Sequence, residues 1–302
     1  MHRRSFLIAS TSLLSIAKAQ TRRADPPLRQ PVRGTHGAVA AGSDWATSAG
    51  MRLYDQGGTA VDAGIAAMFA ASVTELSHFG MGGEAPILIR TKAGKVHAIA
   101  GVGPMPKLAS ADLFRKRAVQ LGDITFRLGP GDHLRGIIPD AGLMPALVPG
   151  MVESGLVALR EFGTKSFTEV VEPALELADG YAVDEMRARS FASAVPFFDL
   201  WPTSKAHFMP NGRTPAIGEV FRQPDLARTL RGMVDAEKKA LAKGSSRQAG
   251  IDAVRDYFYR GEIARKIGEF SKANGGLLRY EDMAAFKVTP EEPLSTTFRG
   301  YI

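Results

Sequence analysis

The sequence predicts a mixed α/β (α+β) fold whose second half is mainly helical. Three observations support this fold class. A helix rich in apolar and small residues at 59–73 is followed directly by strand candidates at 86–90 and 95–100. Helical patterns then dominate residues 150–285. The 45% apolar and 23% charged content of the 302 residues is typical of a soluble globular protein.

The first elements are a short strand and two capped helices. Gly37-Ala38-Val39-Ala40-Ala41 predicts a buried strand, and Ser43 is placed to cap a helix that runs to about Asp55. Thr59 then caps a second helix, with Asp62 three residues later as a capping-box partner. The apolar residues of this second helix recur at helical spacing: Val61, Ile65, Met68 and Phe69.

A glycine-rich turn and a hairpin follow. Phe79-Gly80-Met81-Gly82-Gly83 precedes the strands at 86–90 and 95–100, which Lys92-Ala93-Gly94 joins. The turn lacks a Gly-Lys-Ser/Thr sequence, and it opens a strand rather than a helix. Close backbone packing is therefore favoured over a nucleotide site.

The rest of the chain is predicted from helical periodicity and from glycine and proline stops. Residues 109–117 predict a short helix, and residues 118–145 are irregular. The last residues, 298–302, predict a strand whose partners lie further along the chain, the alternative being an edge strand that closes the protein. Further helices are expected at 150–161, 167–178, 185–193, 223–241, 249–258, 261–273 and 280–285.

Residues 1–19 have the three parts of an export signal peptide. A basic start is followed by a short apolar run from Phe6 to Ile16, and Ala17-Lys18-Ala19 provides a cleavage site. The apolar run is too short and too rich in Ser and Thr to span a bilayer. We therefore expect a periplasmic or secreted protein with no membrane span.

The start of this segment resembles a twin-arginine signal. Arg3-Arg4 stands just before Phe6-Leu7, as in bacterial signals that export folded proteins. The alternatives are an ordinary secretory signal or a surface helix. Cleavage would leave Gln20 first, followed by a flexible lead-in at 20–35.

Charge and cysteine content exclude several classes of function. Removing the three basic residues of the leader lowers the net charge from +7 to +4, and no basic stripe is interleaved with aromatic residues. The sequence therefore argues against a nucleic-acid partner. The absence of cysteine excludes disulfides, thiolate metal sites and a cysteine nucleophile within this chain.

The residues alone predict no metal site, no cofactor and no complete catalytic site. There is no His-Glu-x-x-His sequence and no Gly-x-Ser-x-Gly sequence. Glu281-Asp282 is explained by a helix N-terminus, and Glu172, Glu176 and Asp179 by an exposed helix face. None of the histidines has a partner at metal-ligand spacing: His2, His36, His78, His97, His133 and His207.

Several segments, taken in order, resemble the γ-glutamyltransferase (γ-glutamyltranspeptidase) family of N-terminal-nucleophile hydrolases. They cover residues 36–302 and are specific as an ordered set. The matching segments are Gly37 through Ala41, Gln56 through Ala63, Glu75 through Gly83, Val148 through Val152, Tyr257 through Ala264, Asn274 through Met283, and Phe298 through Tyr301.

The resemblance implies a partial αββα sandwich, with two sheets between helical layers and with 37–101 supplying core helices and the hairpin. It also implies a self-cleaving precursor, in which a threonine freed at the N-terminus of a small subunit is the nucleophile and its own amino group is the base. That threonine has no counterpart in this chain. We therefore expect a large-subunit domain at 36–302, truncated at its C-terminal end, with a small subunit or C-terminal half as its partner.

The resemblance also identifies a substrate-binding position. Family members place an Arg after the second hairpin strand, in an Arg-Glu-x-Ala-Pro segment, where it binds the α-carboxylate of a γ-glutamyl group. Here the pocket position reads Gly101, Val102 and Gly103, with Val102 in place of the Arg. Arg90 and Lys107 lie nearby in the sequence. We therefore expect a small amide substrate, not necessarily glutathione or another γ-glutamyl peptide.

Three functional hypotheses follow. The first is the large-subunit part of an exported amide hydrolase or acyltransferase, which is inactive as this chain alone. The second is a truncated, inactive relative that acts as a binding or interaction protein. The third, disfavoured by the ordered motifs, is a periplasmic binding domain with chance similarity. We also expect an exposed apolar face and unpaired strand edges in the absence of a small subunit.

Overall fold

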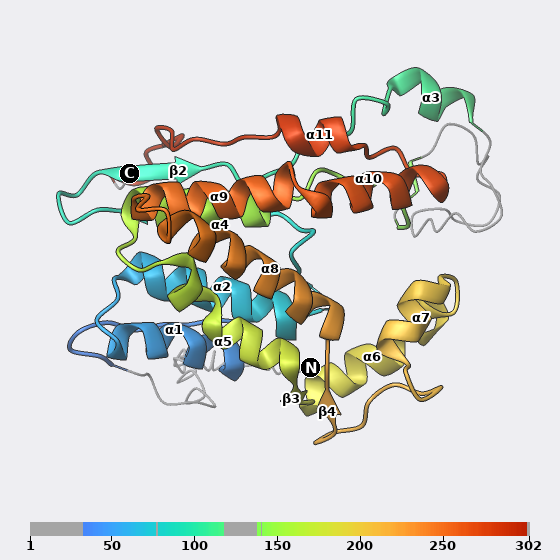
Figure 1. The fold of residues 1–302 in the computed structure, drawn as a ribbon, viewed down its shortest axis with the longest axis horizontal. Helices are drawn as coiled ribbons and strands as arrows, with labels where there is room; N and C mark the ends of the chain where they lie inside the picture. Colours follow the sequence, from blue (N-terminus) through green and yellow to red (C-terminus); the bar gives the residue numbers. More distant parts are fainter. Residues whose placement is uncertain (1–32, 77, 118–137, 140, 301–302) are drawn as a thin grey trace, which may run out of the picture. The chain divides into compact units, whose positions relative to one another are not determined.

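Figure 1 shows the protein as a computed structural model, which describes residues 33–76, 78–117, 138–139 and 141–300. The described residues from Gly37 onward form one compact unit. The predicted export signal, most of the lead-in and most of the stretch 118–145 lie outside the described residues. Within the described part, no helix has the length and apolar character needed to cross a bilayer.

The first two helices begin at the predicted caps. In α1 (Asp44–Asp55), the Ser43 hydroxyl accepts a hydrogen bond from the Ala46 amide at 3.1 Å. In α2 (Ala60–Thr74), Thr59 and Asp62 form a complete capping box. Both predicted helix starts are confirmed. The buried residues of α2 lie on nearly all of its faces, because its small side chains allow neighbouring helices to approach closely.

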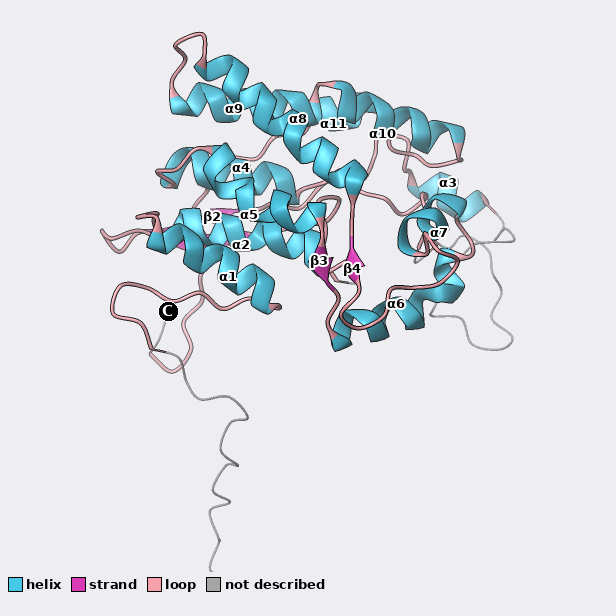
Figure 2. Cartoon of the chain, turned by 60° about the horizontal axis from the view of Figure 1, so that its bottom comes forward, coloured by secondary structure: helices cyan, strands magenta, loops and turns pink. Residues whose placement is uncertain are grey.

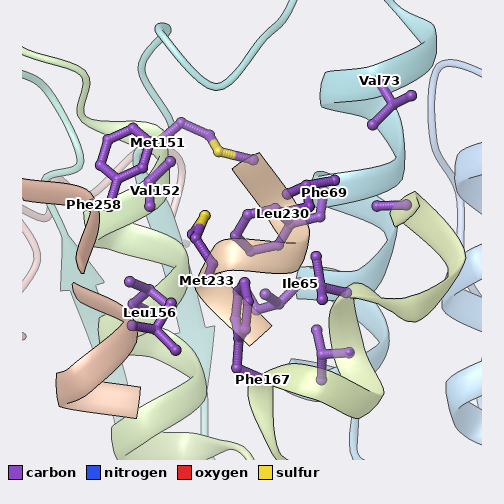
Figure 3. Close-up of a cluster of buried hydrophobic side chains, with 14 of the residues drawn as sticks. Ile65, Phe69, Val73, Met151, Val152, Leu156, Phe167, Leu230, Met233 and Phe258 are labelled. Carbon is purple, nitrogen blue, oxygen red and sulfur yellow. The ribbon is translucent and has the colours of Figure 1, made fainter. Parts of the chain in front are cut away.

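The main core lies between α2 and the helices of the second half. Helix α2 contacts α1, α4 and α5, and α8 contacts both α5 and α9. Figure 3 shows Phe69 from α2 and Leu230 and Met233 from α8 within one cluster of buried side chains. The predicted helices of this half are confirmed, with the bounds α4 Met151–Phe162, α5 Phe167–Asp179, α6 Glu185–Phe198, α8 Pro224–Leu241, α9 Arg247–Tyr259, α10 Glu262–Ala273 and α11 Tyr280–Ala285.

The predicted hairpin is present and packs one face against the core. Strands β1 (Ile87–Arg90) and β2 (Val96–Ile99) pair antiparallel, with Ile87 opposite Ile99 at one end and Arg90 opposite Val96 at the turn. A single bridge joins Ala98 to Glu291 on the outer edge of β2. The short helix predicted at 109–117 is also present, as α3 (Ala111–Lys116).

The mixed fold class is confirmed, but the strands are few. Figure 2 shows that the described chain is mostly helix, and its strands form two two-stranded sheets rather than extended layers. The second sheet pairs β3 (Tyr181–Ala182) with β4 (Val220–Phe221) and was not predicted. Two-residue strands are too short to show an alternating pattern. Helix α7 (Pro202–Phe208) was also not predicted, although proline at its first position is a known start signal.

Two predicted strands are not formed in the described residues. Residues 37–41 pair with no other strand, and the Tyr54 ring lies where a side chain on Gly37 would project. Near residue 298 the chain makes an isolated bridge and then turns, because Arg299 and Gly300 both have positive φ angles of 51° and 83°. A left-handed pair of this kind interrupts an extended strand.

Candidate substrate-binding site

The predicted substrate-binding position lies where three backbone segments meet. The Ala85 amide donates to the Gly101 carbonyl at 3.0 Å, which joins the start of β1 to the loop after β2. The Gly150 and Met151 amides both donate to the Gly83 carbonyl at 2.9 Å, which joins the start of α4 to the same place. We call the meeting point of Gly83, Gly101, Gly103 and Gly150 the glycine junction.

At three of the four junction glycines, Gly101, Gly103 and Gly150, a neighbouring backbone leaves no room for a side chain. A Cβ on Gly103 would lie 1.6 Å from the Val148 carbonyl oxygen. A Cβ on Gly150 would lie 2.2 Å from the Gly101 carbonyl oxygen. Gly101 also has a φ of +54°, in the left-handed region that glycine tolerates best. The close packing that the sequence predicted for the glycine-rich turn therefore extends to the loop after β2.

Val102 stands between two buried glycines and is itself 47% exposed. Its backbone is held on both sides by the junction, while its isopropyl group offers no hydrogen bond or charge. The Val148 amide adds a further support by donating to the Pro104 carbonyl at 3.1 Å. The structure therefore brings Gly101, Val102 and Gly103 together as one supported loop with an aliphatic tip.

Arg90, one of the two cations that lie nearby in the sequence, is at the far end of the hairpin from Val102. The Arg90 guanidinium lies 3.6 Å from the Cβ position of Gly94, at the turn end of the hairpin. Residue 101 follows the opposite end, where Ile87 pairs with Ile99. The Lys107 backbone amide donates to the Asp282 carboxylate at 3.0 Å. Lys107 thus has an anchored backbone and an exposed side chain.

A cavity of about 700 Å³ adjoins the junction through Met81, Gly82 and Pro149. Phe258 and Ile263 contribute apolar surface to it from α9 and α10. A volume of this size falls in the range of small-molecule sites. Its basic residues are each paired with a carboxylate outside or at its rim: Arg228 with Asp225, Arg231 with Asp179, and Lys266 with Glu262. The cavity therefore offers apolar surface rather than an unpaired cation.

A buried polar network supports the start of α4. The Tyr259 hydroxyl donates to the Pro149 carbonyl at 2.6 Å and accepts from the Glu153 amide at 2.9 Å. Both carboxylate oxygens of Glu153 accept from Arg255 Nε, at 2.8 and 2.7 Å. Burial raises the pKa of Glu153 above its usual range, although Arg255 opposes the rise. Burial also raises the pKa of the Tyr259 hydroxyl, so that it remains a donor.

This network was missed by the sequence analysis. Glu153 reads as an ordinary acidic residue in the first turn of a helix, where the helix dipole explains it. Arg255 is about a hundred residues away in the sequence. Tyr259 lies within the Tyr257-Phe258-Tyr259-Arg260 segment, whose aromatic residues predict packing but not which hydroxyl is buried. Only the three-dimensional contact of α4 with α9 brings them together.

The described residues contain no group of three His, Asp or Glu side chains that could hold a metal ion. Several buried hydroxyls bond to carbonyls of their own helix, among them Ser72 to Phe69 and Ser154 to Met151. Such bonds are structural rather than catalytic. The Thr35 hydroxyl contacts the His36 ring at 3.0 Å, but both residues are exposed neighbours in the chain.

Comparison with known proteins identifies the relatives of this chain. A family model described as gamma-glutamyltranspeptidase matches residues 46–302. The chain is 32% identical over 275 residues to the glutathione hydrolase proenzyme of Escherichia coli, covering 90% of this chain and 42% of that relative. It is 27% identical over 274 residues to the acylase ACY 1 proenzyme of Pseudomonas sp. strain SE83, covering 90% and 45%.

Solved structures agree with these sequence matches. The gamma-glutamyltranspeptidase of Helicobacter pylori superposes with a TM-score of 0.73 at 26% identity, covering 90% of this chain and 70% of that chain. A cephalosporin acylase from Bacillus halodurans superposes with a TM-score of 0.69 at 26% identity, covering 91% and 48%. The chain thus spans less than half the length of the curated relatives it matches.

Proposed function

Because this chain belongs to the gamma-glutamyltranspeptidase family, we propose that it is the large-subunit part of an exported amide hydrolase or acyltransferase. The observation that supports this most directly is the loop Gly101-Val102-Gly103. By the resemblance, this loop corresponds to the family's substrate-binding position. The Gly101 carbonyl and the neighbouring Pro104 carbonyl accept backbone hydrogen bonds from two other segments, at Ala85 and Val148. A loop held in this way presents one side chain in a defined position.

The catalytic step itself is proposed to be carried out by a small subunit outside residues 1–302. Its N-terminal threonine would attack the amide carbonyl, and its own amino group would accept the hydroxyl proton. In this proposal the present chain contributes the wall of the pocket and no reacting group. The relatives named as proenzymes, which are more than twice as long as the matched segment, support this division.

The proposed substrate is a small amide whose acyl group lacks an α-carboxylate. Val102 cannot form the charge-assisted pair that an arginine makes with a carboxylate. An aliphatic side chain at that position instead favours an uncharged acyl group. Two relatives are named as acylases, which supports an acyl-amide substrate over a γ-glutamyl peptide.

A second candidate function is a catalytically inactive relative that acts as a binding or interaction protein. One observation favours it. In the described residues β1 pairs only with β2, and Leu88 on β1 is 70% exposed. A free strand edge with an exposed apolar side chain is a surface to which another strand can add. A small subunit would bind the same edge of β1, so binding there does not separate the two functions. Hydrolysis by the assembled pair does.

The test is a hydrolysis assay of chain 1–302, alone and with the small-subunit segment supplied as a second polypeptide. Release of product is measured by mass spectrometry for a γ-glutamyl anilide, glutathione and a set of N-acyl amides. We expect no turnover by the chain alone, and turnover of N-acyl amides above γ-glutamyl substrates by the pair. Robust γ-glutamyl transfer by chain 1–302 alone would overturn the proposal, and an inactive but stable pair would favour the binding function.

A further inference from the structure

The buried hydroxyl of Tyr259 holds the backbone on which the candidate loop 101–104 packs. Tyr259 is fully buried, and its hydroxyl bonds both to the Pro149 carbonyl and to the Glu153 amide. The residues on either side of Pro149 carry the loop: the Val148 amide binds the Pro104 carbonyl, and the Gly150 backbone lies against Gly101. One hydroxyl therefore fixes the turn on which the loop rests.

Glu153, in the first turn of α4, connects the Tyr259 hydroxyl to the segment that follows α11. Glu153 is fully buried and is paired with Arg255. Arg255 Nη2 also donates to the Phe286 carbonyl at 2.6 Å. The Val288 amide donates to Glu153 Oε1 at 3.3 Å. A single ion pair thus binds the backbone at two points in the segment that follows α11.

The same segment continues beside β2. The Ala98 and Glu291 backbones exchange two hydrogen bonds, at 2.9 and 2.8 Å. An ion pair between Lys95 and Glu292 follows at 2.8 Å. Figure 1 shows this segment, in red, running past β2 after α11. Segment 286–291 is therefore attached at one end to the base of α4 and at the other to the strand that leads into the loop.

We propose that Tyr259 and Arg255 are positioning residues, which couple the docking of segment 286–291 to the conformation of loop 101–104. This inference rests on the proposed function, because it assigns the loop to the substrate pocket. When the segment is docked, Arg255 holds Glu153 and the first turn of α4 in place. The Tyr259 hydroxyl, which bonds to both the Glu153 amide and the Pro149 carbonyl, then holds Pro149 in a fixed position. When the segment detaches, the buried pair loses its backbone partners and the turn under the loop loosens.

The test uses amide hydrogen exchange on the full chain, read by mass spectrometry for residues 100–105 and 286–291. Arg255→Lys keeps the charge but cannot hold Glu153 and the Phe286 carbonyl together, since a lysine lacks the planar fork of donors. Tyr259→Phe keeps the buried ring and removes only the hydroxyl. Two less buried counterparts serve as matched controls: Arg260→Lys at an exposed arginine, which pairs with Asp256, and Tyr280→Phe at a half-buried tyrosine, whose hydroxyl donates to the Arg260 carbonyl.

We expect Arg255→Lys and Tyr259→Phe each to raise the exchange rate by at least about tenfold in both regions. The amide signals of Gly101 and Gly103 in nuclear magnetic resonance spectra should shift in Arg255→Lys, although neither glycine bonds to Arg255. The controls should leave both regions within about twofold of the wild type. Helices α1 and α2 should be unchanged in all variants.

Two results would overturn the proposal. In the first, Arg255→Lys speeds exchange only at 286–291, and Tyr259→Phe only at its immediate partners in 149–153. In the second, every region speeds up in parallel, which means a general loss of stability. Both readouts are independent of catalysis, so a pair of this chain and the small subunit that proved inactive would contradict the proposed function without affecting this result.

Discussion

Glu237 caps helix α5 from a position 70 residues away along the chain: its Oε1 accepts a hydrogen bond from the Phe167 amide at 2.7 Å. Its second oxygen accepts from the Thr168 amide and hydroxyl, at 2.7 and 2.6 Å. These amides belong to the first turn of the helix, which has no intrahelical partners for them. The carboxylate is fully buried, and it fixes α5 against α8 inside the core.

Glu237→Ala should lower the free energy of unfolding by about 3 kcal/mol, because it leaves the buried Phe167 amide and the partly buried Thr168 amide without a partner. Glu169→Ala is the matched control. Glu169 is the local capping-box partner of the same helix, but its side chain is half exposed and water can replace it. We expect a loss of about 1 kcal/mol for the control. Urea unfolding followed by circular dichroism measures both, and equal losses would contradict the remote cap.

Asp62 is predicted to make stability depend on pH. It is fully buried, and its carboxylate accepts five hydrogen bonds, from Thr59, Thr164 and Lys165. Burial alone would raise the pKa of Asp62, but these bonds together hold it below its usual value. The stabilisation is therefore complete above the ordinary aspartate pKa of about 3.9, and it is lost as the pH falls through the lower folded value.

Asp62→Asn should destabilise the protein by about 3 kcal/mol at pH 7, and the difference from the wild type should shrink below about pH 4. Asp225→Asn, at an exposed residue of α8, is the control and should change stability by less than about 0.5 kcal/mol. Urea midpoints between pH 3 and pH 7 check the prediction. A difference that stays constant with pH would show that the charge of Asp62 is not involved.

The glycine junction predicts opposite effects for two glycine-to-alanine substitutions. Gly103→Ala places a methyl group against the Val148 carbonyl, so the loop must move, and we expect a loss of more than about 3 kcal/mol. Gly64→Ala lies in α2, with open space at its Cβ position and an exposed site. It should stabilise the protein by up to about 1 kcal/mol. Thermal unfolding of the two variants tests this, and similar midpoints would contradict the contact.

The sequence predicted those elements whose signal is local. Thr59 and Asp62 lie three residues apart and form the expected capping box, and helix bounds set by glycine or by caps fall close to prediction. The same local reading explained Asp62 only as a capping residue. Its bonds to Thr164 and Lys165 come from the connection between α4 and α5, about a hundred residues away, which no periodic pattern reveals.

The candidate site was predicted in part. The ordered motifs led to the hypothesis of a substrate-binding loop at Val102, which stays a prediction. The glycine-rich turn was assigned to backbone packing. The partners of that packing were not foreseen, because hydrogen bonds between Gly83 and the start of α4 depend on how α2 and α4 cross. The expected strand at 37–41 was wrong because extended, apolar sequence predicts a strand only where a neighbouring strand supplies bonds.

Export is predicted from residues 1–19. Expressed in a Gram-negative bacterium, the mature protein should begin at Gln20 or within a few residues of it, because Ala17-Lys18-Ala19 has the pattern of a cleavage site. N-terminal sequencing of the periplasmic fraction measures this. Replacing Arg3-Arg4 with Lys-Lys should block export if the twin-arginine route is used, and leave it intact for an ordinary secretory signal. An intact Met1 on envelope material would contradict cleavage.

Val102→Arg should increase turnover of γ-glutamyl substrates by the enzyme assembled with its small subunit. The new guanidinium would stand at an exposed position on a supported loop, where it can pair with a substrate α-carboxylate. Such a pair contributes roughly 2–5 kcal/mol, so kcat/KM for a γ-glutamyl anilide should rise by at least about tenfold. Turnover of an N-acyl amide without a carboxylate should not rise.

Met105→Arg is the matched control, since Met105 is 44% exposed and lies three residues further along. It adds the same charge outside the junction, so equal gains from both variants would mean general electrostatic attraction and would remove Val102 from the pocket.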